Sequence, residues 1–76
     1  MTAEQKIIAA LHSLLNNDVA MTAETNIRDD LGLDSAELIE LTVLVHTMYG
    51  VDLGRKSAEK KLTPLTVGDL TSLVES

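Results

Sequence analysis

A serine and a histidine, two residue types that hydrolytic enzymes use, lie in one apolar segment of the chain, at Ser35 and His46. A serine nucleophile needs its base within hydrogen-bond reach. These two residues are eleven positions apart on a segment with helical periodicity, which corresponds to about 16 Å of helical rise. We therefore expect no serine–histidine catalytic pair. His46 is expected to be solvated or to face a partner.

Metal and phosphate-loop patterns are also missing from the sequence. There is no cysteine, and His12 and His46 lack the spacing of metal ligands. The run 29–32 is acidic, but a calcium loop with Gly32 at its sixth position would have to begin on Ile27, which cannot ligate. The four glycines are too dispersed for a phosphate-binding loop. We expect no metal site and no nucleotide site.

Ser35 has a setting that no other serine of the chain shares. Asp34 is a good N-cap, and Glu37 stands three residues later to complete a capping box. Ser35 is then the first residue of a helix, with its hydroxyl near free backbone amides and the positive end of the helix dipole. A phosphodiester would be stabilised there. By spacing alone, an ordinary helix start explains the same residues.

The elements that must position Ser35 are helical. Apolar residues recur at helical spacing behind capping residues in three segments, and no period-two alternation persists. We predict an all-α fold, a small four-helix bundle with three main helices and a short third helix, as a single domain over 1–76. The main helices are predicted at 3–15, 35–49 and 67–75, with at most two turns within 55–61, closed by Pro64.

A long connection leads from the first predicted helix to Ser35. It spans about 17 residues, more than a compact domain normally uses without a reason. A short helical turn is predicted over 22–28. Five apolar residues of this connection are expected to pin it to the core: Val19, Met21, Ile27, Leu31 and Leu33.

The charge and the aromatic content of the chain limit which classes of partner it can bind. The 76 residues are 45% hydrophobic and 1% aromatic, with 6 basic and 12 acidic residues and a net charge of −6. Nucleic acid is an unfavourable partner because the chain lacks a basic footprint and stacking aromatics. No run reaches the roughly 18 apolar residues of a membrane span, and no targeting leader is visible. We expect a cytoplasmic protein whose partners present positive charge.

The segment Leu31-Gly32-Leu33-Asp34-Ser35 resembles the acyl carrier protein family, in which a Leu-Gly-x-Asp-Ser element holds the modified serine. The resemblance covers nearly the whole chain, because the predicted elements follow the family's order through Tyr49 to the last helix. It implies that Ser35, flanked by the cap Asp34, is esterified by 4′-phosphopantetheine from coenzyme A. The thiol of that arm would carry an acyl group as a thioester. Carrier proteins do not catalyse the acyl chemistry, so the resemblance also implies that the protein is not an enzyme.

The resemblance also implies partners. These are a phosphopantetheinyl transferase and the ketosynthase, acyltransferase or ligase, ketoreductase and dehydratase of a fatty-acid or polyketide biosynthesis pathway. The carrier is expected to be a monomer that forms complexes with such enzymes. Two alternatives remain open: a carrier of an amino-acyl or aryl group, and a small helical interaction domain that is never modified.

Further residue roles follow from the same resemblance. An aliphatic bundle can part its helices to admit an acyl chain, although ordinary core packing explains the lining residues equally well. Acids on the second helix would meet basic patches of partners, beside exposed aliphatic residues. A basic third helix departs from the acidic one typical of primary fatty-acid carriers and favours a dedicated pathway. The expected acyl-pocket residues are Leu38, Leu41, Val45 and Leu62, and the expected partner-binding residues are Ala36, Glu37, Ile39, Glu40, Val43, Arg55 and Lys56.

Overall fold

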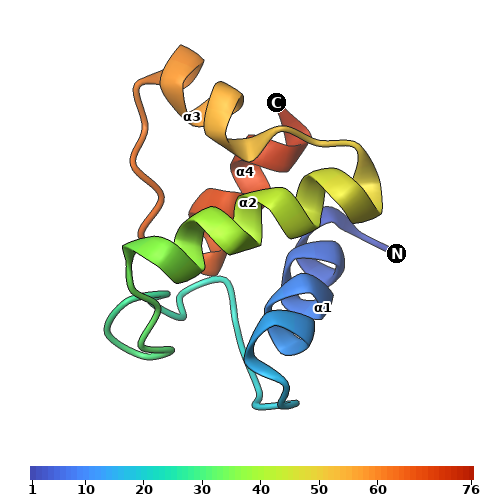
Figure 1. Ribbon diagram of the computed structural model, residues 1–76, viewed down its shortest axis with the longest axis vertical. Helices are drawn as coiled ribbons and strands as arrows, with labels where there is room; N and C mark the ends of the chain where they lie inside the picture. Colours follow the sequence, from blue (N-terminus) through green and yellow to red (C-terminus); the bar gives the residue numbers. More distant parts are fainter.

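The computed structural model describes residues 1–76 and contains four α-helices and no strand. In Figure 1, α2 crosses in front of α4, with α1 below it and α3 above. The architecture confirms the predicted all-α fold with a short third helix. The helices are α1 (Ala3–Leu15), α2 (Ser35–Tyr49), α3 (Leu53–Lys60) and α4 (Val67–Glu75).

The three main helices have the predicted bounds because their ends are specified locally. Each begins with a reciprocal capping box, in which the cap side chain accepts from the third helical amide and the third side chain accepts from the cap amide. α1 and α2 end on left-handed residues, Asn16 and Gly50. The capping pairs are Thr2 with Gln5, Asp34 with Glu37, and Thr66 with Asp69.

The third helix begins two residues before the predicted stretch 55–61. α3 begins at Leu53 because the side chain of Asp52 accepts a 2.9 Å hydrogen bond from the amide of Arg55 and caps the helix. It ends at Lys60, since Lys61 adopts a left-handed conformation with φ of 53°. The end of the helix thus lies within the predicted stretch and before Pro64, as expected.

One cluster of eleven buried residues forms the core, and all of them are apolar. Of the five predicted loop anchors, Ile27 and Leu33 are buried, and Met21 and Leu31 pack against the cluster. The prediction for Val19 was wrong, because its side chain is 48% exposed. The buried residues are Ile7, Ala10, Leu11, Ile27, Leu33, Leu41, Val45, Leu53, Val67, Leu70 and Leu73.

The long loop between α1 and α2 is fastened to the start of α4. The amide of Gly68 donates to the carbonyl of Ala23 at 2.8 Å, and the amide of Val67 donates to the carbonyl of Thr25 at 3.0 Å. These bonds satisfy the first two amides of α4, which have no partner inside the helix. The loop contains no helix, but single hydrogen-bonded turns occur in and next to the predicted stretch 22–28: the amide of Thr25 donates to the carbonyl of Thr22 at 3.1 Å, and the amide of Asp30 donates to the carbonyl of Asn26 at 2.9 Å.

The helices are also short. None of them has both the length and the apolar character that crossing a membrane requires.

Candidate functional site

Ser35 is the first residue of α2, and its side chain is exposed. The carboxylate of Asp34 accepts a 2.8 Å hydrogen bond from the amide of Glu37, and the amide of Asp34 donates to the Glu37 carboxylate at 3.2 Å. The amides of Ser35 and Ala36 have no acceptor within the chain. A group attached to the Ser35 hydroxyl therefore lies beside two free donors at the positive end of the helix.

The loop before α2 sets the position of Ser35 through side-chain hydrogen bonds to backbone. The side-chain oxygen of Asn26 accepts from the amides of Arg28 and Asp29 at 2.9 and 2.8 Å, and Asp30 accepts from the amide of Asn26 at 2.8 Å. Such bonds allow a polar residue to build a turn without secondary structure.

Two residues complete the approach to α2. Gly32 has a φ of 72°, in the left-handed region that glycine adopts without strain. The next residue, Leu33, is buried, and its amide donates to the carbonyl of Ile27 at 3.0 Å. The backbone is thus held in the core two positions before Ser35.

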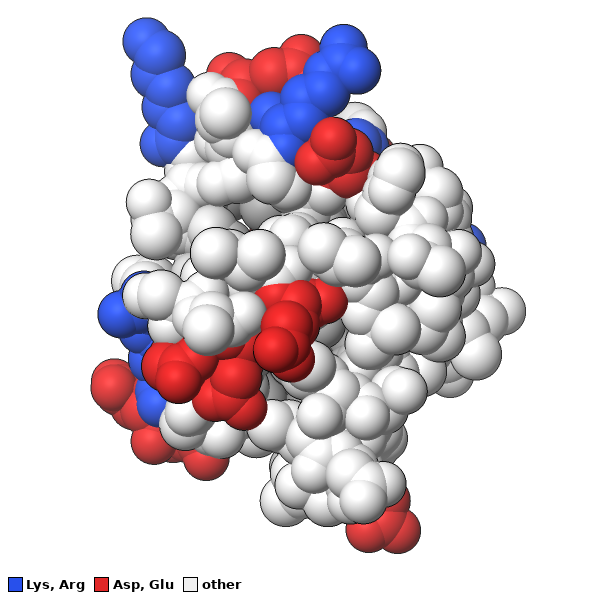
Figure 2. All heavy atoms as spheres, viewed as in Figure 1, with Lys and Arg blue, Asp and Glu red and all other residues white.

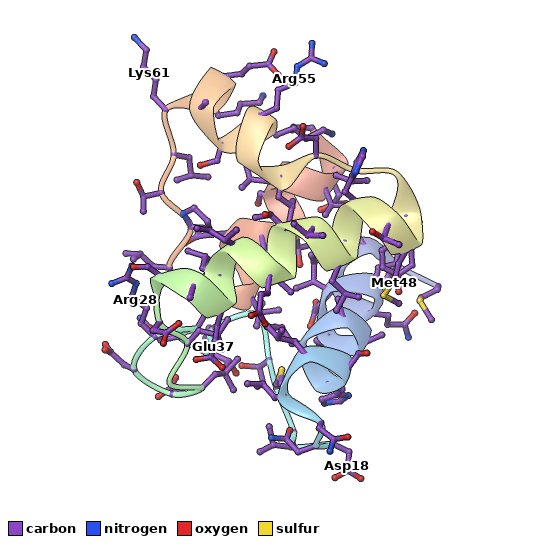
Figure 3. The ribbon with its side chains drawn as sticks, in the orientation of Figure 1. Asp18, Arg28, Glu37, Met48, Arg55 and Lys61 are labelled. Carbon is purple, nitrogen blue, oxygen red and sulfur yellow. The ribbon has the colours of Figure 1, made fainter.

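Acidic side chains surround the start of α2. Figure 2 shows them gathered in the lower part of the molecule, whereas most Lys and Arg side chains on this face lie over α3 at the top. In Figure 3, Glu37 and Arg28 both lie at the end of the molecule where α2 starts. Glu40 is exposed. The only ion pair in the structure joins Arg55 to Glu59, so the acids near Ser35 are not neutralised by salt bridges.

A hollow of about 250 Å³ opens between α2 and α3. Leu38 and Ile39 line it from α2, and they follow Ser35 by three and four residues, which places them on the same side of the helix. Leu53 and Ser57 line it from α3. An apolar space therefore begins one helical turn from the exposed hydroxyl.

The four expected acyl-pocket residues are not brought together in this hollow. Leu38 lines it, whereas Leu41 and Val45 are fully buried in the core. Leu62 lines a separate hollow beside Leu73. Leu41 and Val45 can contact a bound chain only if the helices part.

The expected partner-facing residues of α2 form an exposed row. Ala36 is exposed, and the side chains of Ile39 and Val43 are 64% and 60% exposed. A second hollow, of about 480 Å³, lies between this row and α1, where Leu14 lines it. Sequence reasoning missed the contribution of α1, because helical periodicity does not show which helix packs beside an exposed row.

The basic side chains of α3 and its C-cap differ in whether they have a partner within the chain. Arg55 lies 3.3 Å from Glu59 in an exposed ion pair. The Lys56 ammonium donates to the carbonyl of Ser76 at 2.6 Å, and its side chain is half-buried. Lys60 and Lys61 are exposed and unpaired, and Lys61 extends away from the end of α3 in Figure 3.

The histidines have separate surroundings. His46 is exposed on α2, on the same helix as Ser35, as expected from the sequence. His12 is a half-buried residue of α1, and its Nε2 lies 2.8 Å from the carbonyl oxygen of Val19, which ties the start of the long loop to α1. No group of three or more metal-ligating side chains comes together in the structure.

Comparison with known proteins identifies the family. A family model described as a phosphopantetheine attachment site matches residues 5–73. An acyl carrier protein from Exiguobacterium sp. is 34% identical over 80 residues, which span 100% of this chain and 98% of the relative. The chain belongs to the acyl carrier protein family. Acyl carrier proteins from Helicobacter pylori and Helicobacter acinonychis are 33% and 32% identical over 76 residues, covering 99% of this chain and 94% of each relative.

No solved structure matches the chain. Membership in the acyl carrier protein family confirms two expectations, since this carrier is not an enzyme and its prosthetic group is covalently attached 4′-phosphopantetheine. The residues present suit that group. The exposed Ser35 hydroxyl offers a point of attachment, and the free amides of Ser35 and Ala36 offer donors to a phosphodiester.

Proposed function

We propose that Ser35 is the residue to which 4′-phosphopantetheine is attached, within a single carrier domain over 1–76. One observation carries the proposal: Ser35 is an exposed serine at the first position of a capped helix, with free amides on one side and an apolar hollow one turn away. When bound, the group supplies a thiol on which an acyl chain is carried as a thioester.

The carrier is proposed to serve fatty-acid-like or polyketide biosynthesis, in which it presents acyl intermediates to the enzymes of the pathway. The aliphatic hollow beside Ser35 supports this function, since four of its eight lining residues are hydrophobic. An amino-acyl or aryl carrier of a related assembly line is the alternative. Loading with each class of acyl group separates the two functions.

The proposed docking surface is the exposed row of α2 together with the acids at the start of that helix. Ile39 and Val43 supply apolar contact, and Glu37 and Glu40 supply the negative charge that attracts a basic partner. We extend this surface to the basic side of α3, where the charge comes mainly from Lys60 and Lys61. Arg55 and Lys56 contribute less because they have partners within the chain. Arg55 pairs with Glu59, and Lys56 donates to the carbonyls of Val74 and Ser76.

The attachment proposal is tested by incubating the protein with coenzyme A, magnesium and a broad-specificity phosphopantetheinyl transferase, then recording the intact mass. We expect one phosphopantetheine to be gained by the unchanged protein and none by Ser35→Ala. Ser13→Ala is the matched control, because Ser13 is an exposed serine on α1. Mass gain by Ser35→Ala, or none by the unchanged folded protein, would contradict the proposal.

A further inference from the structure

Arg28 is a free cation at the end of the molecule where α2 starts (Figure 3). Its side chain is exposed, and its guanidinium is in no ion pair, since the one salt bridge of the structure joins Arg55 to Glu59. Lys6 is the only other basic residue before residue 55. Arg28 is therefore an isolated positive charge in an acidic part of the sequence.

Acidic side chains near the start of α2 are bonded to the backbone and do not pair with Arg28. The carboxylate of Asp30 accepts from the amide of Asn26 at 2.8 Å. Asp34 and Glu37 accept from each other's amides at 2.8 and 3.2 Å in the capping box. A guanidinium has five N–H donors. Those of Arg28 thus stay available for a group that is not part of the chain.

Backbone hydrogen bonds place Arg28 alongside the residues that lead into α2. The carbonyl of Arg28 accepts from the amide of Gly32 at 3.0 Å, and the carbonyl of Ile27 accepts from the amide of Leu33 at 3.0 Å. Ser35 is three residues after Gly32, a span of at most about 11 Å even for a fully extended chain. The long side chain of Arg28 is therefore within reach of a group attached to Ser35.

The arm proposed for Ser35 begins with a phosphodiester, which adds a negative charge where acids already gather. Like charges repel, and the free amides at the start of α2 supply donors without a full positive charge. A guanidinium supplies that charge together with parallel N–H groups that match phosphate oxygens. Lys6 lies at the opposite end of α2, 5.4 Å from the centre of the Tyr49 ring. Of the two basic residues before α3, only Arg28 is at the site.

We propose that Arg28 binds the phosphodiester of the 4′-phosphopantetheine arm and acts as a positioning residue for it. The inference rests on the proposed attachment at Ser35. By holding the first atoms of the arm beside the loop, Arg28 offsets the charge of the phosphodiester and limits the directions in which the rest of the arm extends.

Nuclear magnetic resonance of the arginine side chains tests this contact without measuring activity. The chain has two arginines, so two Nε–Hε signals are expected, and Arg28→Gln assigns them. The protein is loaded from coenzyme A, and complete loading is checked by intact mass. We expect the Arg28 signal to shift on loading and the signal of Arg55, which is paired on α3, to stay in place. An unmoved Arg28 signal, or equal shifts of both signals, would overturn the inference.

Thermal unfolding of the unloaded and loaded forms gives a second measurement. Loading should lower the melting temperature of Arg28→Gln by about 3 °C relative to its effect on the unchanged protein, as expected for an exposed charge pair in a domain of this size. The difference should shrink in high salt. Lys60→Gln is the matched control, because it removes the same charge from an exposed, unpaired side chain of α3.

The outcomes separate this inference from the proposed attachment. Equal effects of loading in the Arg28 and Lys60 variants, or no effect in either, would overturn a contact between Arg28 and the phosphodiester. Failure of the unchanged protein to gain the mass of the arm contradicts the proposed attachment. A loaded protein whose Arg28 signal does not move contradicts only the contact.

Discussion

The amide of Gly68 donates a 2.8 Å hydrogen bond to the carbonyl oxygen of Ala23, and a Cβ atom at residue 68 would lie 2.9 Å from that same oxygen. The contact joins the first turn of α4 to the loop that leads to Ser35. Only glycine permits this approach without displacing the loop backbone.

Gly68→Ala should therefore destabilise the protein by about 1–3 kcal/mol, the usual cost of overpacking. Urea unfolding followed by circular dichroism measures the change. Gly54→Ala is the control, since a Cβ there meets only an Asp52 oxygen at 3.6 Å. That substitution should stabilise α3 by about 0.5–1 kcal/mol through helix propensity. Equal effects of the two variants would show that the loop does not constrain residue 68.

The two roles of Asp34, helix cap and negative charge, can be separated. Asp34→Ala should lower the free energy of unfolding by about 1 kcal/mol because the amide of Glu37 loses its acceptor. Asp34→Asn keeps an acceptor and removes the charge, so its stability should stay near that of the unchanged protein. Thermal or urea unfolding of both variants distinguishes a cap from a charge effect. Matching losses of stability in both would indicate that the carboxylate charge is the stabilising feature.

The exposed row of α2 is expected to contact the transferase directly. Ile39→Asp should reduce kcat/KM for phosphopantetheine transfer about tenfold, which corresponds to losing one well-packed apolar contact. Val19→Asp serves as the comparison, because Val19 is also an exposed aliphatic residue but lies on the loop, where its carbonyl oxygen is 2.8 Å from His12 of α1. If the Val19 variant loses as much activity as the Ile39 variant, the row has no special part in docking.

Steering by charge predicts a salt-dependent effect at Glu40. Glu40→Lys should slow transfer several-fold at low ionic strength, and the deficit should shrink in high salt because screening weakens the encounter. Glu75→Lys changes the net charge equally from the exposed end of α4. Initial rates across a salt series measure both variants. A deficit that persists unchanged in high salt would indicate a lost local contact in place of steering.

The sequence predicted the features that depend on residues three or four positions apart. The capping boxes at Thr2, Asp34 and Thr66 specify the starts of the main helices, and those bounds were confirmed. The start of α3 also depends on a local signal, the cap at Asp52. The predicted stretch began later because it was based on the basic residues that follow this cap. Interactions between residues that are close in the sequence therefore allowed almost all of the helix bounds to be predicted.

The surroundings of Ser35 depend on contacts that sequence spacing does not contain. The loop is held by hydrogen bonds that backbone amides of α4 donate to the carbonyls of Ala23 and Thr25. These residues are far from α4 in the sequence, and no side-chain pattern predicts the bonds. The hollow beside Ser35 forms where α2 and α3 meet, so its lining combines residues from separate helices. The sequence therefore predicted Leu38, which lies on the same helix as Ser35, as a lining residue but did not predict Ser57, which lies on α3.

Ile39 lines both the hollow toward α3 and the hollow toward α1. A partner that shifts this side chain changes the space offered to the cargo, which makes the residue a point of thermodynamic coupling. Coupling between two ligands is reciprocal. If docking weakens the hold on the cargo by some factor, the cargo weakens docking by the same factor. A loaded carrier and an empty one would then differ in affinity for the same enzyme. Release of the cargo from the hollow and dissociation of the carrier from the enzyme would be linked by the same coupling free energy.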